Sequence, residues 1–150
     1  MSLRGRTAVL VSVIGLLLSG CGDREGPSLD ARANLGITAD DSEYGTMLFD
    51  ERGQAIYLFD KETAGRPDCS GECAVAWPPV LTTGIPQAAG AVRADLLGTV
   101  VRDDGSMQVT YAGHPLYYYA HEEPGQVLCH DVVEFGGRWL VVTPEGAAAA

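Results

Sequence analysis

Short runs of apolar and β-branched residues, separated by glycine, aspartate or proline, recur along the chain after about residue 44. Runs of this length with turn residues at their ends are typical of β-strands. The pattern predicts strands at 46–50, 55–60, 99–102, 107–111, 116–120 and 139–143. Only residues 92–97 have the pattern of a helical turn. The sequence therefore predicts an all-β fold.

Two parts of this region repeat each other at an offset of 60 residues. The matching positions are Met47/Met107, Gly53/Gly113, Ile56/Leu116, Tyr57/Tyr117, Phe59/Tyr119, Glu62/Glu122, Gly65/Gly125 and Cys69/Cys129, followed at an offset of 62 by Trp77/Trp139. A self-match this long indicates one supersecondary unit used twice. We expect two tandem antiparallel β-meanders, repeat 1 at about 44–83 and repeat 2 at about 97–146, related by a pseudo-twofold axis. They should share one core, because the roughly 100 residues of 44–146 are too few for two.

The predicted strands at 55–60 and 116–120 carry large apolar side chains at consecutive positions, 57–59 and 117–119. Successive side chains of a strand point to opposite faces, so both faces of these strands should be covered. If Tyr57 and Tyr117 are buried, each hydroxyl needs a hydrogen-bond partner. Glu62 and Glu122, each five residues further along, are candidate partners, as are backbone carbonyls.

The first residues have the arrangement of a secretory signal. Arg4 and Arg6 precede an apolar run, 8–18, that is shorter than the roughly 20 residues needed to span a bilayer. Residues 18–21, Leu-Ser-Gly-Cys, resemble the lipobox of bacterial lipoproteins. The resemblance implies a signal peptide at 1–20 and a diacylglycerol on Cys21. Gly22 in place of Asp resembles lipoproteins passed on to the outer membrane, where a cell has two membranes.

The segments that flank the repeats have little capacity to pack. Residues 22–43 are polar with few apolar positions, so 21–43 are expected to be the lipid anchor followed by a flexible tether. Residues 147–150 are alanines after a Pro-Glu-Gly turn, and a disordered tail is expected there.

Charge narrows the range of partners. The formal net charge is −10, and removal of residues 1–20 takes away two arginines and no acid, which leaves −12. Nucleic-acid binding requires basic side chains that neutralise phosphates, so a nucleic-acid partner is excluded. An anionic membrane surface would also repel the domain. The N-terminal lipid is therefore the expected membrane contact.

The repeats resemble a family of bacterial secreted lipoproteins of unknown function, which carry tandem copies of a Tyr-x4-Asp motif. The residues that carry the resemblance are 56–62, the spacing Cys69-x3-Cys73-x3-Trp77-Pro-Pro, and in copy two 104–119 and 136–139. The motif positions are Tyr57 and Glu62 in copy one, and Tyr117 and Glu122 in copy two. This chain departs from the pattern by having Glu for Asp in both motifs, and by Cys129 in copy two. The resemblance covers 45–146 and implies an envelope-anchored lipoprotein, but no reaction.

Three cysteines remain once Cys21 carries lipid. Thiols outside the cytosol tend to oxidise. A Cys69–Cys73 bridge would stabilise by about 2 kcal/mol through chain entropy, and a bridge to Cys129 that closes a long loop by about 4 kcal/mol. Proximity during folding favours the short bridge. We predict Cys69–Cys73, with a bridge to Cys129 as the alternative.

A third interpretation is a metal site. Cys69, Cys73, Cys129 and His130 would offer thiolates and an imidazole, which suit Cu(I) or zinc. It requires all three sulfurs to be reduced and to converge.

Signatures of enzymes are absent from the sequence. It has no Gly-x-Ser-x-Gly, phosphate-loop or His-Glu-x-x-His motif, and its adjacent acidic pairs do not argue for a carboxylate catalytic pair. We expect a protein that is no enzyme and has no cofactor, an envelope-anchored binding or structural module. The sequence does not specify its protein or small-molecule partner. The alternative is a copper- or thiol-redox-active lipoprotein that uses the Cys-x3-Cys and Cys129-His130 pair.

Overall fold

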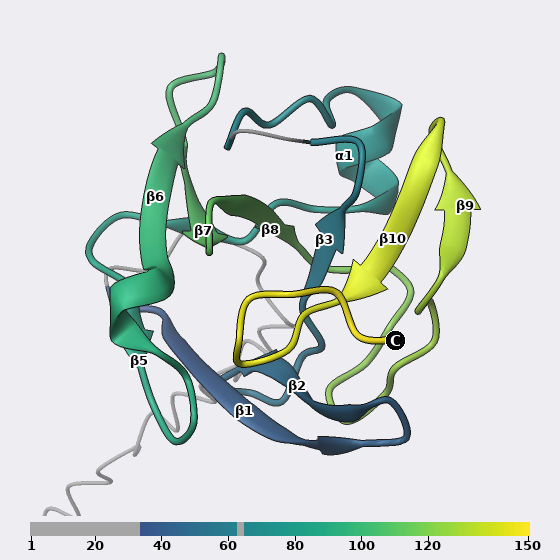
Figure 1. Ribbon diagram of the computed structural model, residues 1–150. Coiled ribbons are helices and arrows are strands. Elements are labelled where there is room, and N and C mark those ends of the chain that lie inside the picture. Colours follow the sequence, from purple (N-terminus) through teal and green to yellow (C-terminus); the bar gives the residue numbers. More distant parts are fainter. Residues whose placement is uncertain (1–33, 63–64) are drawn as a thin grey trace, which may run out of the picture.

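The computed structural model describes residues 34–62 and 65–150, in which nearly all regular structure is β-strand (Figure 1). The elements in chain order are β1 (Gly36–Ser42), β2 (Gly45–Asp50), β3 (Tyr57–Phe59), α1 (Glu72–Ala76), β4 (Leu81–Thr82), β5 (Gln87–Ala88), η1 (Ala94–Leu96), β6 (Leu97–Val101), β7 (Met107–Tyr111), β8 (His114–Tyr117), β9 (Val132–Glu134) and β10 (Gly137–Val141). The predicted all-β fold is confirmed, and η1 lies within the predicted helical turn.

The described strands form two sheets. The larger has seven strands in the order β4-β7-β8-β3-β10-β9, with β6 also paired to β7. The smaller has the order β2-β1-β5, in which β1 and β2 are antiparallel and β1 and β5 are parallel. In Figure 1, β1 and β2 cross below the larger sheet, and β6 stands at its outer side. Strand β6 is thus an edge of the larger sheet and β5 an edge of the smaller one.

The two copies meet at the centre of the larger sheet, where β3 of copy one pairs antiparallel with β8 of copy two. Tyr57 lies opposite Tyr117 in this ladder. On the other side of each central strand, Val141 of copy two lies opposite Tyr57, and Pro79 of copy one lies opposite Tyr117. Val141 and Pro79 are 62 residues apart, as are the two tryptophans. The pairing therefore follows a pseudo-twofold axis, and each copy pairs with the central strand of the other.

The structure shifts the alignment of the copies by one residue in the strand before each central strand. Leu48 N donates to Val142 O at 2.8 Å, and Val109 N donates to Val80 O at 2.8 Å. Leu48 is therefore equivalent to Val109, an offset of 61 instead of the 60 that the sequence match indicates. The turn after β2 has three residues, 51–53, and the turn after β7 has two, 112–113, which accounts for the shift.

Both faces of β3 and β8 are covered, as predicted. Tyr57 and Phe59 contact a cluster that holds the tryptophans and cysteines, whereas Leu58 contacts an aliphatic cluster with Tyr111 and Tyr118. Alternation along the strand places neighbouring residues in different clusters. Each cluster takes residues from both copies, so neither copy has a core of its own.

The predicted start of the domain at residue 44 is wrong. Strand β1 begins at Gly36, inside the predicted tether of 21–43, and Leu35 and Ile37 are buried in the core. The strand pairs with β2 from Ile37 to Ser42. Its later side chains, which include Asp40 and Asp41, are polar and mostly face solvent. The strand is therefore held mainly by backbone pairing with β2 and by few buried apolar side chains, which is why its sequence resembles that of a tether.

The predicted disordered tail is also corrected. Ala149 N donates to Val141 O at 2.9 Å, and Ala149 is buried. Gly146, with φ of +84°, makes the turn that brings the alanines back to β10. The predicted signal peptide, Cys21 and the first part of the tether lie outside the described residues. Within 34–62 and 65–150, no helix has the length and apolar character to cross a membrane.

Some short elements are absent from the sequence prediction. Helix α1 has five residues, too few for a helical period to be visible. Strands β4 and β5 have two residues each. The two prolines after Trp77 lie beside β8, where Pro78 O accepts Tyr118 N at 2.8 Å. A proline can accept a hydrogen bond from a neighbouring strand although it cannot donate one.

Candidate functional site

The motif residues Tyr57, Glu62, Tyr117 and Glu122 are linked in crossed pairs at the centre of the domain. The Tyr57 hydroxyl donates to Glu122 Oε1 at 2.6 Å. The Tyr117 hydroxyl lies 2.7 Å from Glu62 Oε1 and 2.9 Å from Oε2. Each tyrosine therefore binds the glutamate of the other copy, and not the one five residues further along in its own.

Each glutamate also binds the chain that follows its motif. Glu62 Oε1 accepts the backbone N–H of Asp68 at 2.6 Å and of Cys69 at 2.9 Å. Glu122 Oε1 accepts the backbone N–H of Leu128 at 2.6 Å. Hydrogen bonds to an ionised carboxylate are stronger than neutral ones. The acid of the motif is thus a hydrogen-bond acceptor. In this chain the carboxylate of Glu has that role, at the position where the family pattern has Asp.

The four motif side chains are buried, so a molecule bound at the surface cannot contact them. Tyr57 and Tyr117 are 0% exposed, Glu62 is 2% and Glu122 is 7% exposed. Burial, and then the hydrogen bond to the partner glutamate, raise the pKa of both tyrosines far above the ordinary value. Burial also raises the pKa of Glu122. The tyrosines therefore remain neutral hydrogen-bond donors, and the motif braces the two copies against each other.

Four aromatic rings pack in a row between the copies, and three of them are stacked. Phe59 stacks on Trp139 with ring centroids 4.2 Å apart, and Trp139 stacks on Trp77 at 4.0 Å, with 4° between the planes in both pairs. Tyr119 packs against Trp77 at 4.9 Å. Phe59 and Tyr119 are equivalent in the repeat, as are the two tryptophans, so the pairs Phe59–Trp139 and Tyr119–Trp77 follow the same pseudo-twofold relation as the tyrosine–glutamate pairs, although Tyr119 is tilted by 41° to Trp77.

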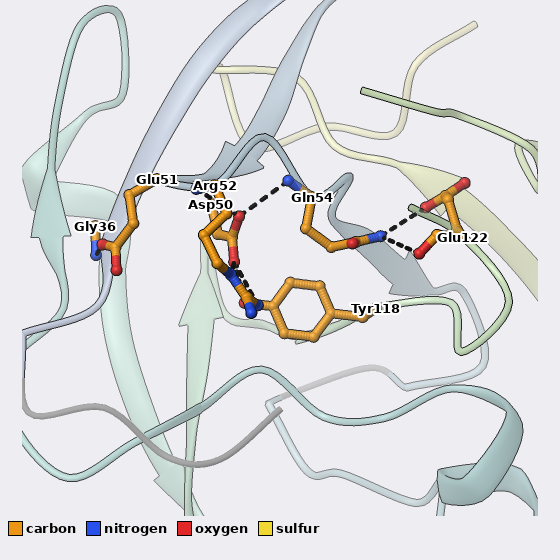
Figure 2. A network of polar contacts seen from close by, with 7 residues as sticks. All are labelled: Gly36, Asp50, Glu51, Arg52, Gln54, Tyr118 and Glu122. Carbon is orange, nitrogen blue, oxygen red and sulfur yellow. Dashed lines mark hydrogen bonds and ion pairs between the residues drawn. The ribbon is translucent and has the colours of Figure 1, made fainter. Parts of the chain in front are cut away.

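A second buried network, which is not predicted from the sequence, joins the first. Asp50 accepts the backbone N–H groups of Arg52 and Gln54, both at 2.9 Å, and the Tyr118 hydroxyl at 3.2 Å. Arg52 also forms an ion pair with Asp50 at 2.9 Å. Figure 2 shows Gln54 between the two networks, and its Nε2 donates to Glu122 O at 3.1 Å. The available signal is an acid directly before a Gly-containing turn, which favours side-chain bonds to the turn backbone.

The predicted disulfide is confirmed. Cys69 and Cys73 are bonded, with their Cα atoms 5.3 Å apart. Cys129 is a buried free thiol. Burial raises the pKa of Cys129, and the charge of Glu122 raises it further. The thiol is therefore held protonated, the unreactive form.

The alternative copper site is contradicted by this bond. Cys69 and Cys73 are joined to each other, so two of the three predicted thiolates are not available as metal ligands. His130 Nδ1 accepts Val141 N at 3.2 Å and serves as a backbone partner. Among the residues that the structure describes, no group of three or more His, Cys, Asp or Glu side chains could hold a metal ion.

An uncharged groove lies at the surface, away from the buried motif. It has a volume of about 560 Å³ and is lined by residues 84–88 and 97–99 together with Ala94 and Met107. Ile85 is 78% exposed there. Ile85 stands between Gly84 and Pro86, and no strand or motif is predicted over residues 84–88.

Comparison with known proteins agrees with the duplication. A family model described as a secreted repeat of unknown function matches residues 38–81 and 98–143, which together are more than half of the chain. These segments correspond to the repeats predicted at about 44–83 and 97–146, and the first begins within β1. No curated protein and no solved structure matches the chain.

Proposed function

Since this chain belongs to the family of secreted repeats of unknown function, we propose that it is a lipid-anchored bacterial envelope module that binds or displays a partner without catalysis. The anchor is Cys21, and the domain lies on the extracytoplasmic side, at the outer membrane where a cell has two. Membership of a secreted family is consistent with an extracytoplasmic module. The Cys69–Cys73 disulfide supports the same side, because disulfides persist in oxidising compartments.

The observation that supports a non-catalytic role is the inward orientation of the whole motif. The residues that identify the repeat are buried, and they bond to one another and to backbone N–H groups. A catalytic group must reach the substrate directly or through one water. The motif instead builds a rigid scaffold, and the function of this scaffold lies on its surface.

Replacement of Cys21 by alanine is expected to abolish lipid attachment. Acyl chains add about 0.8 kcal/mol of membrane affinity per buried CH₂, so two or three chains account for stable anchoring. Cells that express the chain would be fed an alkyne analogue of palmitate, and the protein would be partitioned between detergent and water. The wild type should be labelled and enter the detergent phase, whereas Cys21→Ala should do neither.

The matched control is Cys129→Ala, which removes the free thiol of the domain and should leave labelling unchanged. Label that persists in Cys21→Ala, or disappears in Cys129→Ala, would contradict the proposed anchor.

A further inference from the structure

One edge of β6 has no partner strand among the described residues. At the two ends of its ladder with β7, Ala112 N donates to Leu96 O and Arg102 N donates to Ser106 O, both at 2.9 Å. Hydrogen-bonded pairs alternate along an antiparallel ladder, so Gly98 and Val100 also bond to β7. The backbone N–H and C=O groups of Thr99, which lies between them, therefore point away from β7.

Strand β5 also has an edge with no partner strand in the part of the chain that the structure describes. Gln87 N donates to Leu35 O at 2.8 Å, and Ala89 N donates to Ile37 O at 2.9 Å, so these residues face β1. The N–H and C=O groups of Ala88, between them, point away from β1. Ala88 and Thr99 both line the uncharged groove. The groove thus separates the edge of the smaller sheet from the edge of the larger sheet.

We propose that this groove binds an extended peptide segment of a partner protein, which adds as a strand between β5 and β6. The backbone of the segment would bond to Ala88 and Thr99, and every second side chain would contact Ile85, Leu97 and Met107. Strand addition derives its affinity from main-chain bonds and its specificity from alternate side chains. The inference rests on the proposed function as a binding module, and it names the site and the class of ligand.

The chemistry of β6 favours strand addition. Natural edge strands are protected from pairing by charge, proline or bulges. Residues 97–101, Leu-Gly-Thr-Val-Val, include no charged residue and no proline. Their ladder with β7 is continuous, so no bulge interrupts it. Val101 is also exposed. An unprotected edge beside an uncharged groove is the arrangement that an extended apolar segment requires.

Charge indicates a basic partner and argues against a second copy of this chain. At the start of β6, Arg93 and Asp95 neutralise each other in an ion pair at 2.6 Å. At its end, three aspartates, Asp68, Asp103 and Asp104, line one surface pocket together with two arginines, Arg66 and Arg102, which leaves an excess of one negative charge. A second copy would bring the same excess of acid, whereas a segment with lysine or arginine beside its apolar core would be attracted.

The test uses the mature protein, residues 21–150, in detergent, and the peptide Lys-Val-Thr-Ile-Thr-Val-Lys. Its three apolar side chains lie on one face of an extended strand. We expect amide resonances of 84–88 and 97–101 to shift on titration. The same peptide with glutamate at both ends should bind more weakly, and one with proline in place of isoleucine should not bind. Mass spectrometry should recover the peptide intact.

Ile85→Ser should weaken binding about tenfold, because it removes one apolar contact from the groove. The matched control is Val133→Ser, which changes an apolar residue that is 69% exposed on the edge strand β9 at the far side of the sheet. It should leave binding unchanged, and both variants should keep the unfolding midpoint of the wild type.

Absence of shifts at millimolar peptide, or equal weakening by both variants, would overturn the inference. If the amide resonances of the same residues shift when the protein concentration is raised without peptide, the groove is occupied by a second copy of this chain. Binding only after removal of residues 22–33 would assign it to the preceding part of this chain. If the wild-type protein takes up no lipid label, the proposed anchor is wrong, but the result of the peptide titration is unaffected. The lipid anchor and the peptide site can therefore be refuted independently of each other.

Discussion

Neither half of the duplicated domain is expected to fold alone. Residues 34–90 contain Tyr57 without Glu122, and residues 91–150 contain Tyr117 without Glu62, so each half lacks the acceptor of its central hydroxyl. Each also loses the strand that pairs with its central strand. Chains of about 60 residues bury only some 60% of their unfolded surface, which leaves no margin for such losses.

Amide NMR spectra of the separate halves should therefore have the narrow dispersion of unfolded chains. The intact domain, residues 34–150, is the control and should give a dispersed spectrum and one cooperative unfolding transition. Mixing the halves should restore part of the dispersion, because the β3–β8 pair can form between them. A dispersed spectrum from either half alone would refute the shared core.

Trp139→Ala is expected to lower the free energy of unfolding by about 3–5 kcal/mol. The indole is fully buried and lies between Phe59 and Trp77 in the ring stack, so its removal leaves a cavity between the two copies. Urea denaturation followed by tryptophan fluorescence and circular dichroism would measure the loss.

The control is Phe135→Ala, in the turn of the same hairpin, where the ring is 42% exposed. This variant should lose about 1 kcal/mol or less, because an exposed ring leaves no cavity. Similar losses for both variants would mean that the stack does not hold the copies together.

The sequence predicts the parts of the fold that have a local signal. Strand β7 has the predicted range, 107–111, and β2 is one residue longer than the strand predicted at 46–50. Both strands combine an apolar run with turn residues at its ends. The duplication is visible because side chains such as Trp77 and Trp139 occupy equivalent places in the core. The Cys69–Cys73 bridge follows from proximity in the chain.

Other features depend on contacts that no local pattern records. The sequence supplies two tyrosines and two glutamates, but only the antiparallel β3–β8 pair decides that Tyr57 meets Glu122. Strand β1 looks like a tether because its outward residues are polar and its main partners are backbone groups of β2. The groove arises where the edge of the smaller sheet lies beside the edge of the larger sheet, which again is a tertiary feature.

Crossed tyrosine–glutamate pairs brace the two copies against each other. A double-mutant cycle on the unfolding free energy tests it most directly, with Tyr57→Phe combined in turn with Glu122→Gln and with Glu62→Gln. We expect a coupling of about 1–3 kcal/mol for the pair from different copies, and a coupling within about 0.5 kcal/mol of zero for the pair from the same copy. Stronger coupling of Tyr57 to Glu62 than to Glu122 would contradict it.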